Sequence, residues 1–476
     1  MSYRFLLCFV VSLSVLASLA HAERSDIGYP RLMQGPMVGT VTPDRIALWM
    51  RASGDFEVWV EYSETPDFAA ARTTGKQRAR KANDYCLTFT LTGLAPKTRY
   101  YYRVYVHDGL AHGTGNQPPA HAHTAPPADF AGRLRVMFGS CARYLEDPEQ
   151  PIWDVVERMA PDLFLWLGDN IYGDSLDPDI LAEEWRRQRD VPRLQPVLRT
   201  VPQLAIWDDH DFGLNDHDRT NPIKDEALAV FTRYWANPAA GTAETRGVFF
   251  KYRYGPIEFF MLDGRYHRDP VDAPTGPEKT MLGAGQLQWL LEGLSASDAT
   301  FKVIANGVGW TKGQPVGGDA WSSYLHERAK IFAHIRDAGI GGVFFLSGDT
   351  HVAEMNCIPF SEQDGYDYYE LVSSPLAQRP TQEAIALRPE RRVRPTFVTA
   401  PNAGVLDFDF TGEVPTVTLN TVTIYGGYAW PGVTLAADEL VNGVQSYPDK
   451  QNRDAKMWDA FAQGGVMRVV REGYYP

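Results

Sequence analysis

The sequence predicts a layered α/β fold that follows a small all-β domain. Two patterns predict it. Short stretches in which apolar and polar residues alternate dominate the first quarter of the 476-residue chain, and apolar strands then alternate with amphipathic helices. The composition, with 44% hydrophobic and 22% charged residues, is that of an ordinary globular protein. It excludes a disordered or fibrous chain.

Residues 1–22 have the pattern of a signal peptide. A basic start at Arg4 precedes an apolar stretch from Phe5 to Leu19, and the small-residue pattern Ala20-His21-Ala22 follows. This stretch is short for a bilayer span, so cleavage is favoured over a retained membrane anchor. We therefore expect a secreted or periplasmic protein with no transmembrane segment after cleavage.

Residues 30–125 are predicted to form a small β-sandwich. Apolar and polar residues alternate from Phe56 to Tyr62, which is the period of a half-buried strand. The stretch 91–104 resembles the corner and strand of fibronectin type III domains, in which a tyrosine hydroxyl returns to the upstream backbone. We expect this domain to serve as a scaffold or to shape substrate access.

Two other segments flank the expected catalytic domain at 132–426. Residues 116–129, rich in Pro, Ala and His, are predicted to be a linker, in which His121 and His123 are solvated rather than bound to metal. The tail at 427–476 has no clear period. We predict that it closes the molecule, by covering the site or capping the core.

The catalytic domain is predicted from its alternation of strands and helices. The expected strands are 134–139, 162–168, 203–207, 301–306, 342–347, 368–373, 404–410 and 417–425. The expected helices are 151–159, 178–189 and 327–338.

Polar residues follow four of these strands at the point where each ends, which is where open α/β sheets place ligands. The four motifs are Gly139-Ser140-Cys141, Gly168-Asp169-Asn170-Ile171-Tyr172, Trp207-Asp208-Asp209-His210-Asp211 and Ser347-Gly348-Asp349-Thr350-His351. They supply a thiol, a phenol, carboxylates and imidazoles, which suit two adjacent metal ions that share one carboxylate. Taken singly, each motif could instead be structural: a solvated acidic turn at 208–211, or an inert core thiol at Cys141.

The spacing of Asp169 and Tyr172 indicates the kind of metal. An aspartate oxygen can bridge two cations, and a tyrosinate favours iron(III) over softer or divalent ions. The alternative for this pair alone is a strand that ends in a turn, with Tyr172 as ordinary packing.

These motifs, in this order, resemble those of the alkaline phosphatase D (PhoD-like) phosphatases and phosphodiesterases, whose core is of the calcineurin-like metallophosphoesterase type. Further matching segments are 215–216, 262–265, 319–324 and 370–374. The resemblance implies an α/β/β/α sandwich and a hydrolase of phosphate esters. It also implies that iron(III) is held by Cys141, Asp169, Tyr172 and His351. Asp169 would bridge to a second metal, calcium or another divalent ion, bound by Asp209 and Asp349.

The chain departs from the wider metallophosphoesterase pattern at two positions. Where that pattern has Gly-Asn-His, this chain has Asp208-Asp209-His210, and the added carboxylate favours a harder second metal. Where the core usually supplies a further histidine, this chain has Asn306, a weak ligand candidate. Asp208 and Asp263 could each orient a ligand or cap a turn.

The predicted reaction is attack on phosphorus by a metal-bound hydroxide, without a covalent enzyme intermediate. His210 is the candidate to protonate the leaving alkoxide or hold a phosphate oxygen, because imidazole changes charge near neutral pH. Arg143 and Arg265 are candidates to bind phosphate oxygens through their guanidinium forks.

Three functional hypotheses remain open at this stage. The leading one is an alkaline phosphatase, phosphodiesterase or both, acting on a small phosphate ester; the second is a phospholipase D-like or cell-wall phosphodiesterase. The third is a catalytically silent surface-binding protein. The net charge of −13 argues against stable nucleic-acid binding. Oligomeric state is not predicted, and a disulfide between Cys86 and Cys357, in different predicted domains, is not expected.

Overall fold

The computed structural model describes residues 29–107, 109–111, 120–311, 318–380, 392–394, 398 and 400–451. The predicted signal peptide and the part of the predicted closing segment beyond residue 451 lie outside the described residues.

The first part of the chain forms two small antiparallel sheets. One contains β1 (Leu32–Thr42), β2 (Arg45–Ala52) and β6 (Cys86–Thr92). The other contains β3 (Glu57–Ser63), β4 (Arg72–Thr73), β5 (Gln77–Arg78), β7 (Arg99–Val106), β8 (Gly109–Leu110) and β9 (Ala120–His123). The Tyr100 hydroxyl accepts a hydrogen bond from the backbone N–H of Ala95 at 2.9 Å. The expected return of a tyrosine to the upstream backbone is therefore confirmed.

The predicted linker is wrong in part, because it contains strand β9 (Ala120–His123). This strand pairs with β7, and Ala120 and Ala122 are buried while His121 and His123 are half-buried on the other face. The burial alternates with period two, as expected for a strand that covers a core with one face. The proline- and alanine-rich composition hid this short pattern.

The catalytic part contains two six-stranded sheets. The first contains β10 (Arg133–Gly139), β11 (Leu163–Leu167), β12 (Gln203–Ile206), β19 (Asn402–Asp409), β20 (Thr416–Thr423) and β21 (Val433–Ala436). The second contains β13 (Phe250–Tyr254), β14 (Ile257–Met261), β15 (Phe301–Ala305), β16 (Val343–Ser347), β17 (Glu354–Ile358) and β18 (Tyr368–Val372). Strands β10, β11 and β12 run parallel, as do β14, β15, β16 and β18. Parallel strands end at a common edge, so the carboxyl ends of β10, β11 and β12 lie together in the first sheet. Those of β14, β15, β16 and β18 lie together in the second sheet.

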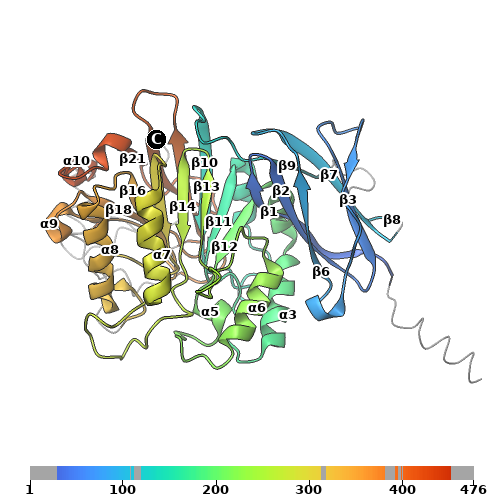
Figure 1. Cartoon of the computed structure of the whole chain (residues 1–476), viewed down its shortest axis with the longest axis horizontal. Helices are drawn as coiled ribbons and strands as arrows, with labels where there is room; N and C mark the ends of the chain where they lie inside the picture. Colours follow the sequence, from blue (N-terminus) through green and yellow to red (C-terminus); the bar gives the residue numbers. More distant parts are fainter. Residues whose placement is uncertain are drawn as a thin grey trace, which may run out of the picture.

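The two sheets face one another between helical layers, so the predicted α/β/β/α sandwich is confirmed. The rings of Phe301 and Phe344 in the second sheet pack against Phe408 in the first, at centroid distances of 5.5 and 6.4 Å. Helix α2 (Ile152–Met159) packs on β19 and β20, whereas α7 (Gly283–Ala296) and α8 (Leu325–Asp337) lie over the second sheet (Figure 1).

The remaining helices include α3, which has the predicted bounds. Besides α2, α7 and α8, the α-helices are α3 (Pro178–Arg189), α4 (Gln195–Thr200), α5 (Asp209–Phe212), α6 (Lys224–Tyr234), α9 (Phe360–Gln363) and α10 (Tyr447–Lys450). Helix α3 begins at Pro178 because Asp177 accepts a hydrogen bond from the N–H of Asp179 at 3.0 Å and proline suits the first helical position. In this part of the chain, helices α4, α5, α6, α7, α9 and α10 and strands β13, β14, β17 and β21 were not predicted.

The front sheets are joined to the catalytic part by an ionic cluster. Asp84, in a turn of the front sheets, accepts hydrogen bonds from Arg51 of β2 at 2.9 Å and from Arg186 of α3 at 2.9 Å. The Tyr234 hydroxyl of α6 also donates to the Asp84 carboxylate. In Figure 1 the blue front strands lie beside β12, α3 and α6.

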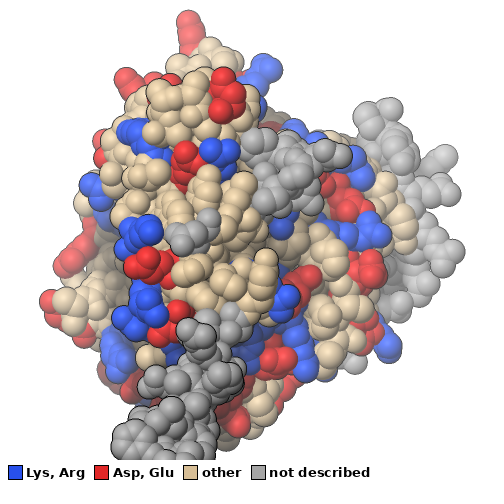
Figure 2. Space-filling model, turned by 90° about the vertical axis from the view of Figure 1, so that its right-hand side faces the viewer, with Lys and Arg blue, Asp and Glu red and all other residues tan. Residues whose placement is uncertain are grey.

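The predicted closing segment is in part an element of the first sheet. Strand β21 pairs with β20 and so forms the edge of that sheet, which agrees with a core-capping role for residues 433–436. No helix among the described residues is long and apolar enough to cross a membrane. Cys86 is a buried free thiol, so no disulfide joins it to Cys357. Basic and acidic side chains are interspersed on the face that Figure 2 shows.

Candidate metal centre

The four predicted motifs meet at one place in the structure. Cys141 follows β10, Asp169 follows β11, Asp208 follows β12 and Asp349 follows β16. The backbone N–H of Cys141 donates to the carbonyl of Gly168, and the N–H of Asp349 donates to the Ser140 hydroxyl at 3.2 Å. The loops that follow β10, β11 and β16 are therefore in direct contact.

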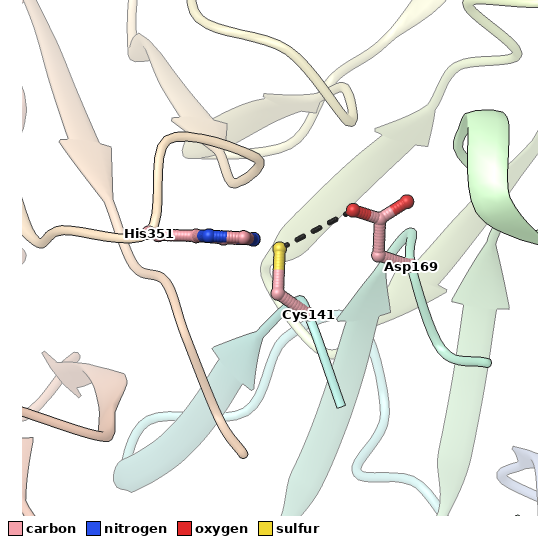
Figure 3. Close-up of side chains that lie close together, drawn as sticks. All are labelled: Cys141, Asp169 and His351. Carbon is pink, nitrogen blue, oxygen red and sulfur yellow. Dashed lines mark hydrogen bonds between the residues drawn. The ribbon is translucent and has the colours of Figure 1, made fainter. Parts of the chain in front are cut away.

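Cys141, Asp169, Tyr172 and His351, which we call the Cys141 side, converge within hydrogen-bond distances. Oδ2 of Asp169 lies 3.4 Å from the Cys141 sulfur and 3.4 Å from the Tyr172 hydroxyl. That hydroxyl lies 3.2 Å from Nε2 of His351. Figure 3 shows the Cys141 sulfur between the His351 ring and the Asp169 carboxylate.

The backbone of these loops adopts a left-handed conformation that residues other than glycine rarely take. The φ angles are +61° at Cys141, +49° at Asp169, +66° at Asp349 and +52° at His351. Left-handed backbone at non-glycine residues costs about 1 kcal/mol or more at each position and clusters at functional sites. The surrounding structure thus holds these side chains inward at the expense of local backbone strain.

The electrostatics of the Cys141 side fit a bound cation. Burial, and then the neighbouring charge of Asp209, raise the pKa of Asp169 well above its ordinary value. Oδ1 of Asp169 is buried without a hydrogen-bond partner in the described structure. Burial also raises the pKa of the Cys141 thiol to about 12, although Ser374 donates a hydrogen bond to its sulfur and the Ser140 hydroxyl lies 3.3 Å from it. These anionic forms are stable here only beside a positive charge.

His351 is prepared to act as a neutral ligand. Burial, followed by repulsion from His210, lowers the pKa of His351 to about 4. Its ring is therefore neutral near pH 7 and has a free nitrogen lone pair, which is the form that binds metals.

A second group of acids, which we call the Asp208 side, lies next to the first. Asp208, Asp209 and Asp319 each have a carboxylate oxygen within 4.8 Å of the others. Arg265 donates to Asp208 and, at 2.5 Å, to Asp319, and its Nη2 lies 3.5 Å from Asp209. Arg268 pairs with the second oxygen of Asp319. Two guanidinium groups therefore offset part of the charge of these three acids.

The position of Arg265 corrects one prediction. Its side chain is fully buried and is directed at carboxylates, so it does not present a fork to a phosphate group. Burial alone would lower the pKa of Arg265, but Asp208 and Asp319 raise it well above the ordinary value. Arg265 therefore carries a permanent charge inside the protein.

Asp209 connects the two sides, and Asp349 lies close by. Oxygens of Asp169 and Asp209 and a ring nitrogen of His210 lie within 4.8 Å of one another. The Arg265 and His210 charges outweigh burial and lower the pKa of Asp209 to about 2. Burial and the charge of Asp319 raise the pKa of Asp349 well above its ordinary value. Asp349 is not in the tight donor groups found among the described residues, so its role as a ligand stays a prediction.

His210 and Arg143, the other predicted catalytic residues, both contact the Tyr172 ring. The His210 ring centroid lies 4.2 Å from that of Tyr172, and the Arg143 guanidinium lies 5.0 Å from it. Nδ1 of His210 lies 2.5 Å from the carboxylate of Asp174. Burial acts to lower the pKa of His210, but Asp174 and Asp209 raise it overall.

Three acids that organise the centre were missed or given the wrong environment. Asp174 and Asp319 were not predicted as site residues, because Asp174 lies past the motif that ends at Tyr172 and Asp319 lies far along the chain from the end of β15. Asp211 is not in a solvated turn: it is buried and accepts hydrogen bonds from the backbone N–H groups of Asn170, Ile171 and Asp208. It thereby fixes the loop of Asp169 against the loop of Asp209.

The weaker candidates are structural in this arrangement. Oδ1 of the buried Asn306 accepts the backbone N–H of Val308. Asp263 accepts hydrogen bonds from the Trp207 indole at 2.7 Å and from the backbone N–H of Arg265 at 2.9 Å. Asp263 therefore caps the turn that carries Arg265.

Comparison with known families agrees with this geometry. Residues 136–423 match the family described as PhoD-like phosphatase, and residues 18–126 match the PhoD-like phosphatase N-terminal domain. The chain belongs to the PhoD-like phosphatase family. It is accordingly a phosphoester hydrolase.

Individual relatives of this PhoD-like protein agree with that assignment. This chain is 24% identical over 410 residues to alkaline phosphatase D of Bacillus subtilis (strain 168). The match covers 72% of this chain and 68% of that protein. A solved structure of PhoD, 17% identical, superposes with a TM-score of 0.73 over 92% of this chain and 99% of the other. Purple acid phosphatase PPD1 from yellow lupin seeds, 14% identical, has a TM-score of 0.54 over 86% and 74%. These two structures support the fold.

Proposed function

We propose that this phosphoester hydrolase is an exported alkaline phosphatase with phosphodiesterase activity, and that it uses iron(III) together with calcium or another divalent ion. The observation that carries the proposal is the convergence of a thiol, a phenol, an imidazole and a buried carboxylate on the Cys141 side. When bound, such ions lower the pKa of water and offset the negative charge that protects phosphate esters.

The donor chemistry supports a different ion on each side. Cys141, Asp169, Tyr172 and His351 form a set of anionic and nitrogen donors that suits iron(III). Asp209 offers carboxylate oxygen, which suits a hard divalent ion, with Asp169 shared and Asp349 nearby. Oδ1 of Asp169, which has no hydrogen-bond partner, is the oxygen available to be shared.

His210 is the proposed proton donor to the leaving group. Asp174 occupies Nδ1 of His210 and so leaves Nε2 for proton transfer. Against burial, Asp174 and Asp209 raise the pKa of His210, which favours the protonated ring that can neutralise the alkoxide as the bond to phosphorus breaks. Asp174 is a positioning residue that fixes the orientation of the imidazole.

Arg143 is the proposed phosphate-binding residue. Its guanidinium lies over the Tyr172 ring, and no carboxylate among the described residues forms an ion pair with it. A guanidinium held in one plane can donate two parallel hydrogen bonds to phosphate oxygens. Arg143 therefore takes the role that the buried Arg265 cannot fill.

Export is proposed on the sequence pattern of residues 1–22, a basic start, an apolar stretch and a small-residue cleavage point. Mass spectrometry of the mature N-terminus tests it: a chain that begins after Ala22 is expected, and an intact Met1 on protein from the cell interior would refute it.

Metal analysis combined with two substrates tests the proposed activity. We expect purified protein to contain iron and a divalent ion and to hydrolyse both 4-nitrophenyl phosphate and bis(4-nitrophenyl) phosphate. Chelation should abolish both activities, and adding back calcium should restore them if only the second ion was removed. Metal-free protein with full activity would contradict the proposal.

A further inference from the structure

The Asp208 side contains its own positive charges, and they are held rigidly. Arg265 and Arg268 have no exposed side-chain surface, and between them they contact all three carboxylates. Arg268 also donates to the Tyr324 hydroxyl at 2.8 Å and lies over that ring. Both guanidinium groups are therefore buried among the acids that they contact.

Asp208 is equally fixed. A Cβ atom at Gly168 would lie 2.5 Å from Cβ of Asp208, and one at Gly307 would lie 2.6 Å from its Cγ. Only glycine leaves room for the Asp208 side chain at these two positions. Oδ2 of Asp208 nevertheless has no hydrogen-bond partner in the described structure. One oxygen is therefore clamped by Arg265, and the other remains available.

The two sides of the centre consequently present different charge to an incoming cation. On the Asp208 side, two guanidinium groups offset three carboxylates. On the Cys141 side, no ion pair among the described residues involves Asp169, and a thiol and a phenol are added to it. A guanidinium stays charged at any physiological pH and cannot coordinate a metal, so its charge only repels.

We propose that Arg265 and Arg268 form a cationic clamp that selects the ion on the Asp208 side, admitting a weakly held divalent ion and rejecting a trivalent one. The clamp thereby confines iron(III) to the Cys141 side. This inference rests on the proposed function, in which the Asp208 side takes the second metal.

The repulsion from a fixed charge grows in proportion to the charge of the ion. If removal of one guanidinium strengthens binding of a divalent ion by about tenfold, the same change strengthens binding of a trivalent ion by about thirtyfold, which is the 3/2 power of ten. The ratio of the two effects identifies an electrostatic origin. A change in shape alone would not scale with ionic charge.

Arg268→Met is the variant to test, because Arg268 has fewer acidic partners than Arg265 and methionine retains most of its apolar length. Holoprotein is first dialysed to remove weakly bound divalent ions. Calcium is then titrated by calorimetry, and terbium(III) is titrated by its luminescence. Relative to wild type, we expect binding to be about tenfold tighter for calcium and about thirtyfold tighter for terbium.

Two matched variants complete the design. Arg268→Lys keeps the positive charge and should bind both ions as the wild type does, even if its stability falls. Arg328→Met removes a buried arginine that pairs with Glu362 at 2.9 Å, away from the centre, and should leave both affinities unchanged. If Arg268→Met proves unable to fold, Arg268→Gln provides the same loss of charge with a hydrogen-bonding group.

Unchanged or weaker binding of both ions in folded Arg268→Met or Arg268→Gln would overturn the proposal, as would an equal gain for calcium and terbium. Failure of the proposed function looks different: the wild type itself would lack metal or phosphoesterase activity. If the wild type contains metal and is active, but Arg268→Met binds calcium and terbium with unchanged affinity, only the clamp proposal is refuted.

Discussion

The Cys141 side and the Asp208 side lie next to one another but balance their buried acids in different ways. On the Cys141 side, the pKa of Asp169 is raised well above its ordinary value, first by burial. On the Asp208 side, Arg265 and His210 outweigh burial at Asp209 and lower its pKa to about 2, whereas at Asp208 burial outweighs Arg265 and raises the pKa to about 7. No ion pair among the described residues reaches Asp169, although Arg143 lies over the Tyr172 ring, whereas Arg265 and Arg268 pair directly with the acids of the Asp208 side. Metal loading should therefore depend mainly on the Cys141 side.

Asp169→Ala should have the largest effect, because Asp169 belongs to the donor groups that reach both Cys141 and Asp209. We expect loss of bound metal and a fall in kcat/KM of at least about 10³-fold, since metal ions supply several kcal/mol of transition-state stabilisation. Elemental analysis and steady-state kinetics measure both quantities.

Asp162→Ala is the control for this variant. Asp162 pairs with Lys97 at 2.7 Å, away from the donor groups, so metal content should be retained. If Asp169→Ala kept its metal and its turnover, the carboxylate would not be shared by two ions, and the two sides would be independent.

His210→Ala should separate catalysis from metal binding. Loss of a general acid typically lowers turnover by about 10²- to 10⁴-fold, and we expect this fall with metal content unchanged. The effect should be larger on phenyl phosphate than on 4-nitrophenyl phosphate, because a poorer leaving group needs the proton more. Asp174→Asn should show the same trend, with a smaller loss.

His334→Ala provides the comparison for this series. His334 lies on α8 and contacts Ser295 and the carbonyl of Leu291, so kcat should not change. Metal loss in His210→Ala, or equal losses on both substrates, would make His210 a ligand rather than a proton donor.

Tyr172→Phe should leave the protein folded but remove a spectroscopic signal. A tyrosinate bound to iron(III) absorbs visible light by charge transfer, so iron-loaded wild type should be coloured and the variant should not. Tyr252→Phe is the matched control, because the Tyr252 hydroxyl donates to the carbonyl of Val41 in the front sheets. A colourless, iron-loaded wild type would remove Tyr172 from the ligand set of the Cys141 side.

Local sequence patterns placed the strand-end residues of both sides, Asp208 and Asp209 included, but neither Asp319 nor the burial of Arg265. Each residue of the Cys141 side follows a strand closely, and parallel strands bring their carboxyl ends together, so Asp169 and His351 could be placed from the chain alone. Arg265 looked like a phosphate ligand because sequence does not reveal burial. Its partner Asp319 lies 54 residues later in a loop, and only tertiary packing brings them together.

The composition-based predictions failed for a related reason. His121 and His123 were assigned to a linker because proline and alanine surround them, but the backbone of β9 pairs with β7. A four-residue strand gives too few alternating positions to outweigh its composition. Helix 178–189 succeeded because Asp177 and Pro178 signal its start locally.

Asp84 offers the smallest and most specific test of the comparison, because arginines clamp it and it belongs to none of the donor groups found among the described residues. Burial acts to raise its pKa, but hydrogen bonds from Arg51 and Tyr234 lower it below the ordinary 3.8. Since the folded pKa is the lower one, the stabilisation is complete above about pH 4 and is lost as the pH falls through the folded pKa.

Asp84→Asn should therefore lower the free energy of unfolding at pH 7 by roughly 2 kcal/mol, the usual size for hydrogen bonds to a charged group. The difference from wild type should shrink at pH 3, and calcium should not reduce it, whereas calcium should stabilise Arg268→Met more than wild type. Urea denaturation with and without calcium measures both.

Stabilisation of Asp84→Asn by calcium beyond that of wild type would mean that metal binding is coupled to the joint between the two parts of the molecule. In that case the response of Arg268→Met would no longer report on its own side of the centre.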